Sequence, residues 1–436
     1  MNREDIQLRF CKYKISRFEI VIPNRDEPFV LDEAHIGNWS IEKDFENYFF
    51  PFMEFRCMVP DTIYTEIMQT SEDVYVDLKV EYAYFEDTYE MDPAAMLFTY
   101  DKLLESRYYA FIANRSPKLT DALLGEKDKD AENEPNEWTQ YSYDNQKSLV
   151  MALYKPEHVF KTNQIVNAVL GQATPIDAVC WILQKIEAEH VLMTPVTSAK
   201  KFDQMIIPPL SAPQAIMYVI NHYGLYEDGA IVFFDYDRCF INSKKLGCTA
   251  YNYAEHHEVY LTSFPASSDQ SVMKSGYYFN NEEKYLVINI LGNSISISNE
   301  SMFVDQLTGG NIVGIDSNTG EVFRVDSEVN VSDQSLSKKG VVNRVVVIDS
   351  GETSTINSLK TSAEQSQNLL NIVVENINIQ ALLPNKDYIF TTDNVKYQQY
   401  QGHYRITNMS AAFTKESQFY SCFCTATFMG GQKQLS

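Results

Sequence analysis

Two aspartates that follow a predicted strand are the clearest candidates for metal chemistry in this chain. The apolar run Ile231 to Phe234 predicts a buried strand, and Asp235 and Asp237 come directly after it. Alternate residues of a strand share a face, so both carboxylates could hold a divalent metal against a diphosphate, as in some glycosyltransferases. No nucleotide-binding series of strands and helices precedes them, and acidic pairs are common at strand ends. We expect no metal here, and an enzyme acting on cell-wall polymer or nucleotide-sugar through Asp235 and Asp237 stays as the alternative.

Two further groups have residue types that bind metals, but their spacing argues against binding. His256, His257 and Glu258 are adjacent, and neighbouring side chains of a strand point to opposite faces, so the two histidines rarely reach one ion. The acidic run Gly125 to Glu137 lacks the ligand positions and the turn glycine of an EF-hand calcium loop. We therefore expect a structural or surface role for the first group and a solvated loop for the second.

The cysteines predict neither a disulfide framework nor a catalytic thiol. There are seven of them, without a CxxC spacing, which favours free and mostly buried thiols in a reducing compartment. Cys180 lies in an apolar helical stripe and Cys239 on a predicted strand, neither in a neighbourhood that suggests a nucleophile. Cys422 and Cys424 alternate along a strand and are expected to pack as small apolar residues. A nucleophile elbow, a phosphate loop and a dinucleotide-binding glycine motif are all missing, so we expect no catalytic, cofactor-binding or metal-binding residue.

Charge and composition restrict the class of partner. The 436 residues include 59 acidic and 36 basic ones, which gives a net charge of −23 at pH 7. Such a surface repels phosphate, which argues against sequence-specific nucleic-acid binding. It would suit a passage through which DNA slides without binding. The alternative explanation of the acidic charge is solubility alone. The 28 tyrosines and 25 phenylalanines suit half-buried sheet faces and protein interfaces. We expect no signal peptide, because the start Met1 to Asp5 has no apolar core, and no membrane span, because Thr162 to Gln184 is interrupted by Gly171 and Pro175.

Strand patterns at both ends of the chain enclose a part with helical patterns. Val74 to Phe85 alternates apolar and polar residues, the pattern of an antiparallel strand with one packed face. Thr174 and Pro175 predict a helix start, with threonine as N-cap and proline at the first helical position. The fold class is therefore α+β, mainly β. The predicted divisions are a first β domain over 1–116, an acidic loop over 117–148, a middle α+β domain over 149–250, and a second β domain over 251–436 with an insertion at about 326–376.

Two segments resemble parts of a known protein family. In Pro208 to Asn242, Ser211 and Gln214 form a capping-box pair, Gly224 supplies the helix stop, and an apolar strand follows. This segment resembles one in the baseplate hub proteins of contractile-tailed bacteriophages, where a Pro-Pro-Leu-Ser lead and a helix ending in Tyr-Gly precede an apolar strand. Gly402 to Phe428 is similar to the closing hairpin of the same hubs, with a Tyr-Arg-Ile-Thr strand, a polar turn and a last strand of alternating small and aromatic residues.

The resemblance implies a structural protein of the virion and no enzymatic activity. It implies two tail-tube-like antiparallel β-barrel or sheet domains flanking the middle domain, in a homotrimer whose ring adapts a sixfold tail tube to a threefold central spike. The implied partners are the tail-tube, spike and baseplate wedge proteins, with DNA only as a passenger through the lumen and no membrane insertion. The protein would be assembled in the host cytoplasm into the tail baseplate, and strands such as Val74 to Phe85 would associate edge to edge around the ring. A peripheral baseplate component is an alternative.

Overall fold

Strands dominate the computed structural model of this chain, as the sequence predicts. The first barrel, described below, is antiparallel throughout. Three of the four described α-helices lie in one central stretch of the sequence, and the fourth, α1 (Asp61–Gln69), lies between two strands of the barrel. The fold class predicted from the sequence, α+β and mainly β with antiparallel barrel or sheet parts, is therefore confirmed. The structure describes residues 9–23, 25–46, 49–86, 101–112, 146–195, 201–226, 229–235, 238–244, 258–264, 276–280, 285–291, 295–298, 312–316, 322–325, 344–348, 369–384, 386–392, 395–416 and 419–432.

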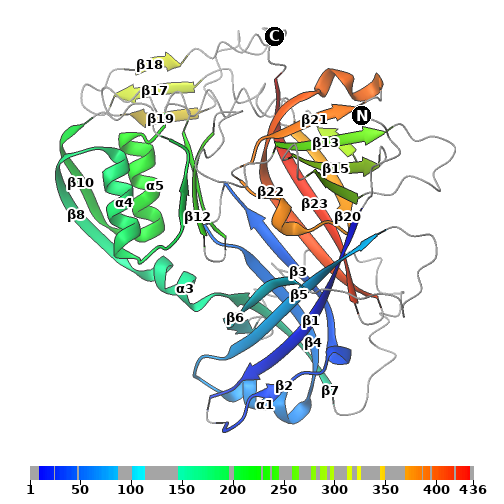
Figure 1. Ribbon diagram of the computed structural model, residues 1–436. Helices are drawn as coiled ribbons and strands as arrows, with labels where there is room; N and C mark the ends of the chain where they lie inside the picture. The colour runs from blue at the N-terminus through cyan, green and yellow to red at the C-terminus, as the bar shows by residue number, and fades with distance from the viewer. Residues whose placement is uncertain are drawn as a thin grey trace.

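Eight strands from both ends of the chain close into an antiparallel barrel (Figure 1). Around the barrel the order is β22-β3-β4-β7-β6-β5-β1-β23, and β23 pairs again with β22. In β5 the alternation works as expected: Val76, Leu78 and Val80 are buried, while the residues between them face outward. The strands are β1 (Arg9–Val21), β3 (Ile36–Asp44), β4 (Phe52–Pro60), β5 (Tyr75–Glu86), β6 (Asp101–Ile112), β7 (Gln146–Tyr154), β22 (Gly402–Glu416) and β23 (Phe419–Gln432).

Three expectations from the sequence can be compared with this barrel. Residues 1–116 do not complete it, because β7 and the terminal hairpin β22–β23 supply three of its strands. The helical part begins after Tyr154, so residues 149–154 lie in the barrel and not with the helices. Val74 to Phe85 was expected to offer a free edge, and this is wrong: the strand pairs with β1 on one side and β6 on the other.

A second strand group extends from the terminal hairpin. Half of β22 pairs with β3 of the barrel, whereas Tyr404 near its start pairs with Tyr388 of β21. From β21 the sheet continues through β13 and β15 to β14, which touches β1 at the pair Arg9 and Tyr277. On the other side β23 pairs with β20, and β20 with β16. The group consists of β13 (Glu258–Phe264), β14 (Gly276–Asn280), β15 (Tyr285–Leu291), β16 (Ile295–Ser298), β20 (Leu369–Glu375) and β21 (Tyr388–Thr392).

The segment expected as an insertion contributes to two different sheets. Its residues 369–375 form β20 of the second strand group, so this end of the segment is part of the main sheet. Residues 344–348 form β19, which pairs in parallel with β17 in a small separate sheet. That sheet contains β17 (Ile312–Asp316), β18 (Val322–Val325) and β19 (Arg344–Ile348).

The α/β part between Lys155 and Lys244 packs two helices against a two-stranded ribbon. Thr174 is the N-cap of α4, as predicted, and forms a capping box with Asp177: its backbone N–H donates to the Asp177 carboxylate at 2.9 Å and its hydroxyl accepts from the Asp177 N–H. Gly224 ends α5 with a φ of 75°, a conformation that favours glycine. The elements are α3 (Pro156–Asn163), β8 (Ile165–Ala173), α4 (Pro175–Lys185), β9 (Val191–Met193), β10 (Phe202–Ser211), α5 (Ala212–Tyr223), β11 (Ala230–Asp235) and β12 (Arg238–Ser243).

Strand β11 lies between two hydrophobic cores. On one face Phe233 belongs to the barrel core and meets Phe45 edge to face at 4.7 Å; on the other, Phe234 belongs to the core of the α/β part. Inside the barrel the Trp39 ring stacks on the rings of Phe413 and Phe55, with centroid distances of 3.6 Å and 5.1 Å. The barrel interior is therefore filled by side chains.

Candidate functional site

Asp235, the first candidate for metal chemistry, holds an ion pair inside the protein. It ends β11 and is 6% exposed, and Lys43 of β3 places its Nζ 2.8 Å from the carboxylate. The Lys43 side chain is fully buried. Asp237 lies outside the described residues, so the expected pairing of the two carboxylates is not tested. The ammonium group of Lys43 thus occupies the position beside the Asp235 carboxylate that a metal ion would take, and it supplies the compensating positive charge. The ion pair also links the barrel to the α/β part.

The cysteines of the described region are free, as expected. Five of them are buried, and only Cys180 among these six is exposed. Burial raises the pKa of Cys11 and of Cys57 to about 12, so both thiols stay protonated at neutral pH and are poor nucleophiles. Cys422 and Cys424 both face the interior, as their spacing predicts. The described cysteines therefore act as small packing residues, apart from the exposed Cys180.

The remaining metal candidates give no site in the described part of the chain. His256, His257 and the run Gly125 to Glu137 lie outside it. Within it, no group of three or more His, Cys, Asp and Glu side chains is arranged to hold a metal ion. None of the described helices is both long and apolar enough to cross a membrane. The functional surface of the described residues must therefore be sought in what the outer faces of the sheets present.

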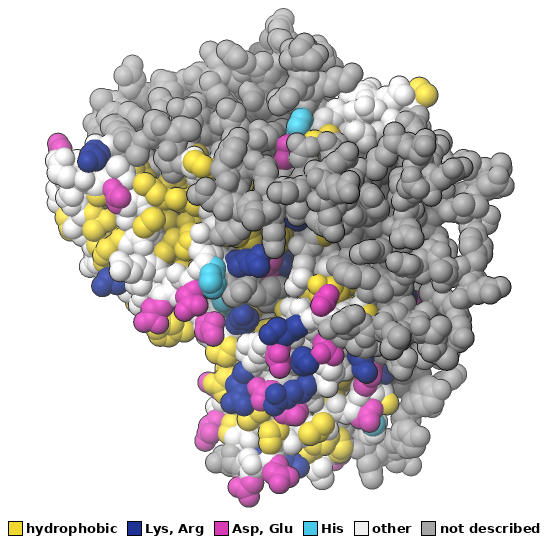
Figure 2. Space-filling model, in the orientation of Figure 1, with side chains coloured by type: hydrophobic (Ala, Val, Ile, Leu, Met, Phe, Trp, Pro, Cys, Tyr) yellow, Lys and Arg dark blue, Asp and Glu magenta, His cyan; other side chains and the backbone are white. Residues whose placement is uncertain are grey.

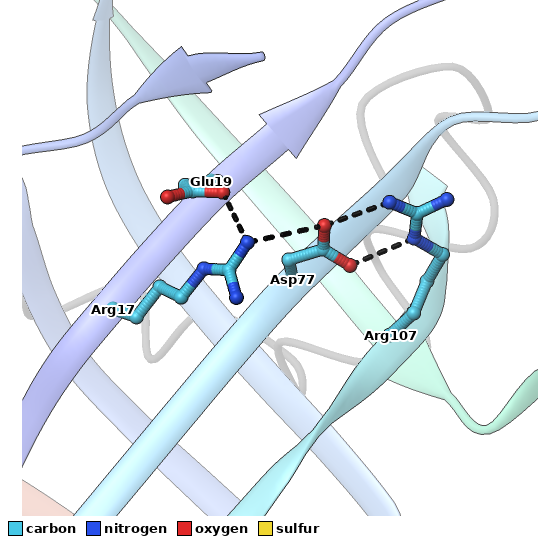
Figure 3. Close-up of polar contacts among 4 residues, drawn as sticks. All are labelled: Arg17, Glu19, Asp77 and Arg107. Atoms are coloured by element: carbon cyan, nitrogen blue, oxygen red, sulfur yellow. Dashed lines mark hydrogen bonds and ion pairs between the residues drawn. The ribbon is translucent and has the colours of Figure 1, made fainter.

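A network of opposite charges covers the outer face of β1, β5 and β6 (Figure 3). Arg107 donates two hydrogen bonds to Asp77, from Nε at 2.7 Å and from Nη2 at 2.8 Å. Arg17 lies between two carboxylates, with Nη2 2.7 Å from Glu19 and 3.7 Å from Asp77. The bidentate hydrogen bond from Arg107 lowers the pKa of Asp77. We call Arg17, Glu19, Asp77 and Arg107 the charge ladder, and Figure 2 shows basic and acidic side chains interleaved over this region.

The charge ladder is expected to contribute more to the recognition of a partner protein than to the stability of the fold. Surface ion pairs contribute about 0–1 kcal/mol each, because solvent screens them and side-chain entropy opposes them. A surface of alternating sign instead favours a partner whose charges are complementary in position. The alternation of Val74 to Phe85 predicts that Asp77 faces outward. It does not reveal the arginines on neighbouring strands, which come from β1 and β6.

A row of aromatic rings crosses four neighbouring strands on the same outer face. Phe52 lies 5.6 Å from Tyr154, and Tyr154 lies 5.7 Å from Phe111, measured between ring centroids. Phe111 meets Tyr109 at 4.6 Å, and Tyr109 meets Tyr75 at 5.8 Å. We call these five residues, from β4, β7, β6 and β5, the aromatic row. All are partly exposed, and aromatic residues in this state are typical of protein interfaces. Composition predicted such surfaces; only the strand order places these rings together.

Several solved structures of low sequence identity are similar to this chain. One is a tail protein from Neisseria meningitidis MC58, with 8% identity, a TM-score of 0.49, and coverage of 95% of this chain and 96% of the other. Another is a 43 kDa tail protein of prophage MuSo2 from Shewanella oneidensis, with 8% identity, a TM-score of 0.46, and coverage of 96% and 99%. A third is a type VI secretion component from E. coli, with 8% identity, a TM-score of 0.38, and coverage of 95% and 77%. No curated protein matches the sequence.

The sequence itself matches a bacteriophage protein family over nearly its whole length. The model of the family described as Bacteriophage PBS1 gene 109 protein aligns with residues 11–427. The matched residues include the barrel, the α/β part and all but the last strand residues of the terminal hairpin. The resemblance to phage tail proteins predicted from two segments is confirmed at this level: the chain belongs to the Bacteriophage PBS1 gene 109 protein family.

Proposed function

We propose that this chain is a structural hub of a phage tail baseplate, acting as a symmetry adaptor and not as an enzyme. In this proposal three copies form a ring that joins a sixfold tail tube to a threefold central spike. The proposal is supported mainly by the presence of two β parts in one chain that belongs to a bacteriophage family. One barrel and a second strand group share the hairpin β22–β23, so each copy brings two β parts to a ring. Three copies would then present six.

The packing of the barrel supports a passage between copies and not through one chain. Its interior is occupied by fully buried aromatic side chains, among them Tyr13, Phe18 and Phe55. A lumen would then lie at the centre of the ring, lined by surfaces of an acidic chain with a net charge of −23. Like charges on protein and phosphate would let DNA pass without binding. The virion baseplate is the proposed location, after assembly in the host cytoplasm, with tube, spike and wedge proteins as partners.

The enzymatic alternative through Asp235 and Asp237 has less support. Lys43 neutralises Asp235 in a buried position, and none of the described residues forms a metal-binding cluster beside it. A general acid or metal ligand also needs access to substrate, and Asp235 is 6% exposed. The ion pair is better explained as a contact that fixes the α/β part on the barrel.

Light scattering on the purified chain, followed by electron microscopy and particle averaging of the same peak, tests the proposal. One copy has a mass of 50.1 kDa, so a trimer is expected at about 150 kDa, with a ring-shaped projection of pseudo-sixfold outline. A monomer alone would be followed by co-expression with the tube and spike proteins of the same phage. A chain that remains monomeric there, or joins the particle away from its axis, would contradict the hub proposal and favour a peripheral component.

A further inference from the structure

A groove opens where the α/β part meets the outer face of the barrel. Its volume is about 940 Å³. Outward-facing residues of β22, β3, β4 and β7 form its floor, and α3 together with Pro213 in the first turn of α5 forms its wall. Helix α3 lies between helices α4 and α5 and the barrel in Figure 1. Phe50 sits at the junction, 4.5 Å from the His158 ring and 5.2 Å from Phe234. The groove is thus built by two parts that the buried Lys43–Asp235 pair holds together.

The lining of the groove is mainly apolar and continuous with the aromatic row. Phe52, Tyr154 and Phe111 line it, and these are the first three rings of the row. Phe111 is 43% exposed, which is high for a phenylalanine with no contact to a partner protein. The row then leaves the groove and continues over Tyr109 and Tyr75. An apolar surface therefore begins in a recess and extends across the open face of the barrel.

Carboxylates stand at one side of this apolar surface. Glu42 and Asp44 of β3 line the groove, and Glu54 lies on the same outer face of β4. Burial raises the pKa of Glu42, and repulsion from Glu54 raises it further. Glu54 accepts a hydrogen bond from Arg56 at 3.3 Å, whereas Glu42 has no ion pair with any residue that the structure describes. A cation brought beside Glu42 would relieve both the repulsion and part of the burial cost.

We propose that the groove and the aromatic row bind an extended segment of a partner protein in which apolar side chains occupy every second position and a basic residue on the same face of the segment precedes them. One apolar side chain enters the groove beside Phe52 and Phe111, and the next ones lie along Tyr109 and Tyr75. A lysine or arginine of the segment meets Glu42. The row runs from β4 over β7 and β6 to β5, which is about 15 Å at the usual strand spacing, or about four to five extended residues.

The shape and the charge of the site favour this occupant over two others. A small ligand would use the recess and leave the exposed rings of the row unexplained, whereas an extended segment covers both. A second copy of this chain would bring a net charge of −23 toward a surface that already presents carboxylates. A basic, apolar segment complements the groove in both respects. The inference does not depend on ring formation, so it can fail while the proposed hub function stands.

Binding of labelled peptides to the full chain, followed by fluorescence anisotropy, tests the inference. The probe is a short peptide with lysine at its first position, phenylalanine at every second position after it and serine between them; its controls replace the phenylalanines by serine or the lysine by glutamate. We expect the first peptide to bind at least about tenfold more tightly than either control, because a buried aromatic anchor and a matched charge both contribute. Phe111→Ser and Glu42→Gln should each weaken binding by about fivefold or more, with an unchanged melting temperature.

A matched variant separates the groove from the general character of the surface. Phe160 of α3 is 60% exposed and does not line the groove, so Phe160→Ser should leave peptide binding unchanged. Equal binding of the serine–lysine peptide would overturn the inference, because it would indicate attraction to an acidic protein only. An equal loss in Phe160→Ser would also overturn it. So would light scattering in which Phe111→Ser separates copies of the chain, because the occupant would then be a second copy.

Discussion

Lys43 and Asp235 illustrate how a single buried contact can determine the arrangement of two parts. Removing one partner leaves the other charge buried without compensation, which typically costs about 3–5 kcal/mol. We therefore expect Lys43→Met to lower the free energy of unfolding by about that amount, measured by urea denaturation. The double variant Lys43→Met with Asp235→Leu should recover most of the loss, because neither charge remains. A double variant no more stable than the single one would show that the pair is needed for packing beyond its charge.

Asp77 leads to a prediction about pH. Its pKa lies below the ordinary value of 3.8, chiefly because Arg107 donates hydrogen bonds to its charged form. A carboxyl with a lowered folded-state pKa contributes stability above its unfolded value and loses this contribution as the pH falls through the folded value. Asp77→Asn should therefore lower stability by about 0.5–1 kcal/mol at pH 7 and flatten the decline below pH 4.

Thermal unfolding between pH 2 and pH 7 measures this effect. Asp203→Asn is the matched control, because Asp203 is an exposed aspartate that accepts a hydrogen bond from Gln172 and has no arginine partner among the described residues. Equal acid profiles for the two variants would mean that the charge ladder contributes nothing specific to stability.

At the scale of elements, the terminal hairpin depends on one close approach between its strands. Gly430 of β23 has a φ of 146°, and a Cβ placed there would overlap the carbonyl oxygen of His403 and lie 3.0 Å from the Cα of Tyr404. We expect Gly430→Ala to lower the free energy of unfolding by more than about 1 kcal/mol, because the backbone atoms it meets cannot move aside cheaply.

Gly171 of β8 offers the comparison for this variant. A Cβ at that position would meet nothing closer than the Asp203 carbonyl oxygen at 3.9 Å, so Gly171→Ala should be nearly neutral in the same denaturation experiment. If Gly430→Ala were equally harmless, β22 and β23 would have to be farther apart at this point than the structure places them.

The stability of helix α4 also depends on one local contact, made by its N-cap residue. Thr174 accepts a hydrogen bond from the Asp177 N–H at 3.3 Å and starts the capping box. Thr174→Ala should cost about 1 kcal/mol in chemical denaturation. Thr65→Ala makes the same chemical change inside α1 (Asp61–Gln69), where the hydroxyl bonds only to the Asp61 carbonyl, and should be neutral or slightly stabilising. A similar loss in both variants would argue against a capping role.

At the scale of the whole molecule, charge should govern association. Each copy of the chain has a net charge of −23, so copies that meet in the proposed ring would repel one another at low ionic strength. Raising the salt from about 0.05 to 0.5 M shortens the screening length and should shift light-scattering masses toward the proposed trimer. Dissociation at high salt would contradict this expectation. It would indicate that opposite charges, such as those of the charge ladder, hold the copies together.

The sequence alone determined the features that depend on consecutive residues. The alternation in Val74 to Phe85, the N-cap at Thr174 and the stop at Gly224 each predict a local structure, and each is confirmed. Such signals persist because periodicity, capping and backbone freedom act within one or two turns of chain. The free thiols of the described cysteines and the mainly β class follow from the same local reasoning.

Only the tertiary structure decided which distant residues meet. Lys43 and Asp235 are 192 positions apart, and β22 joins β3 across more than half of the chain. A strand pattern states which face is apolar, but not which partner strand or register completes the sheet. For that reason the sequence did not predict that β7 and the terminal hairpin close the first barrel. The aromatic row and the groove arise from the same strand order, because the rings come from four different strands and only strand pairing brings them side by side.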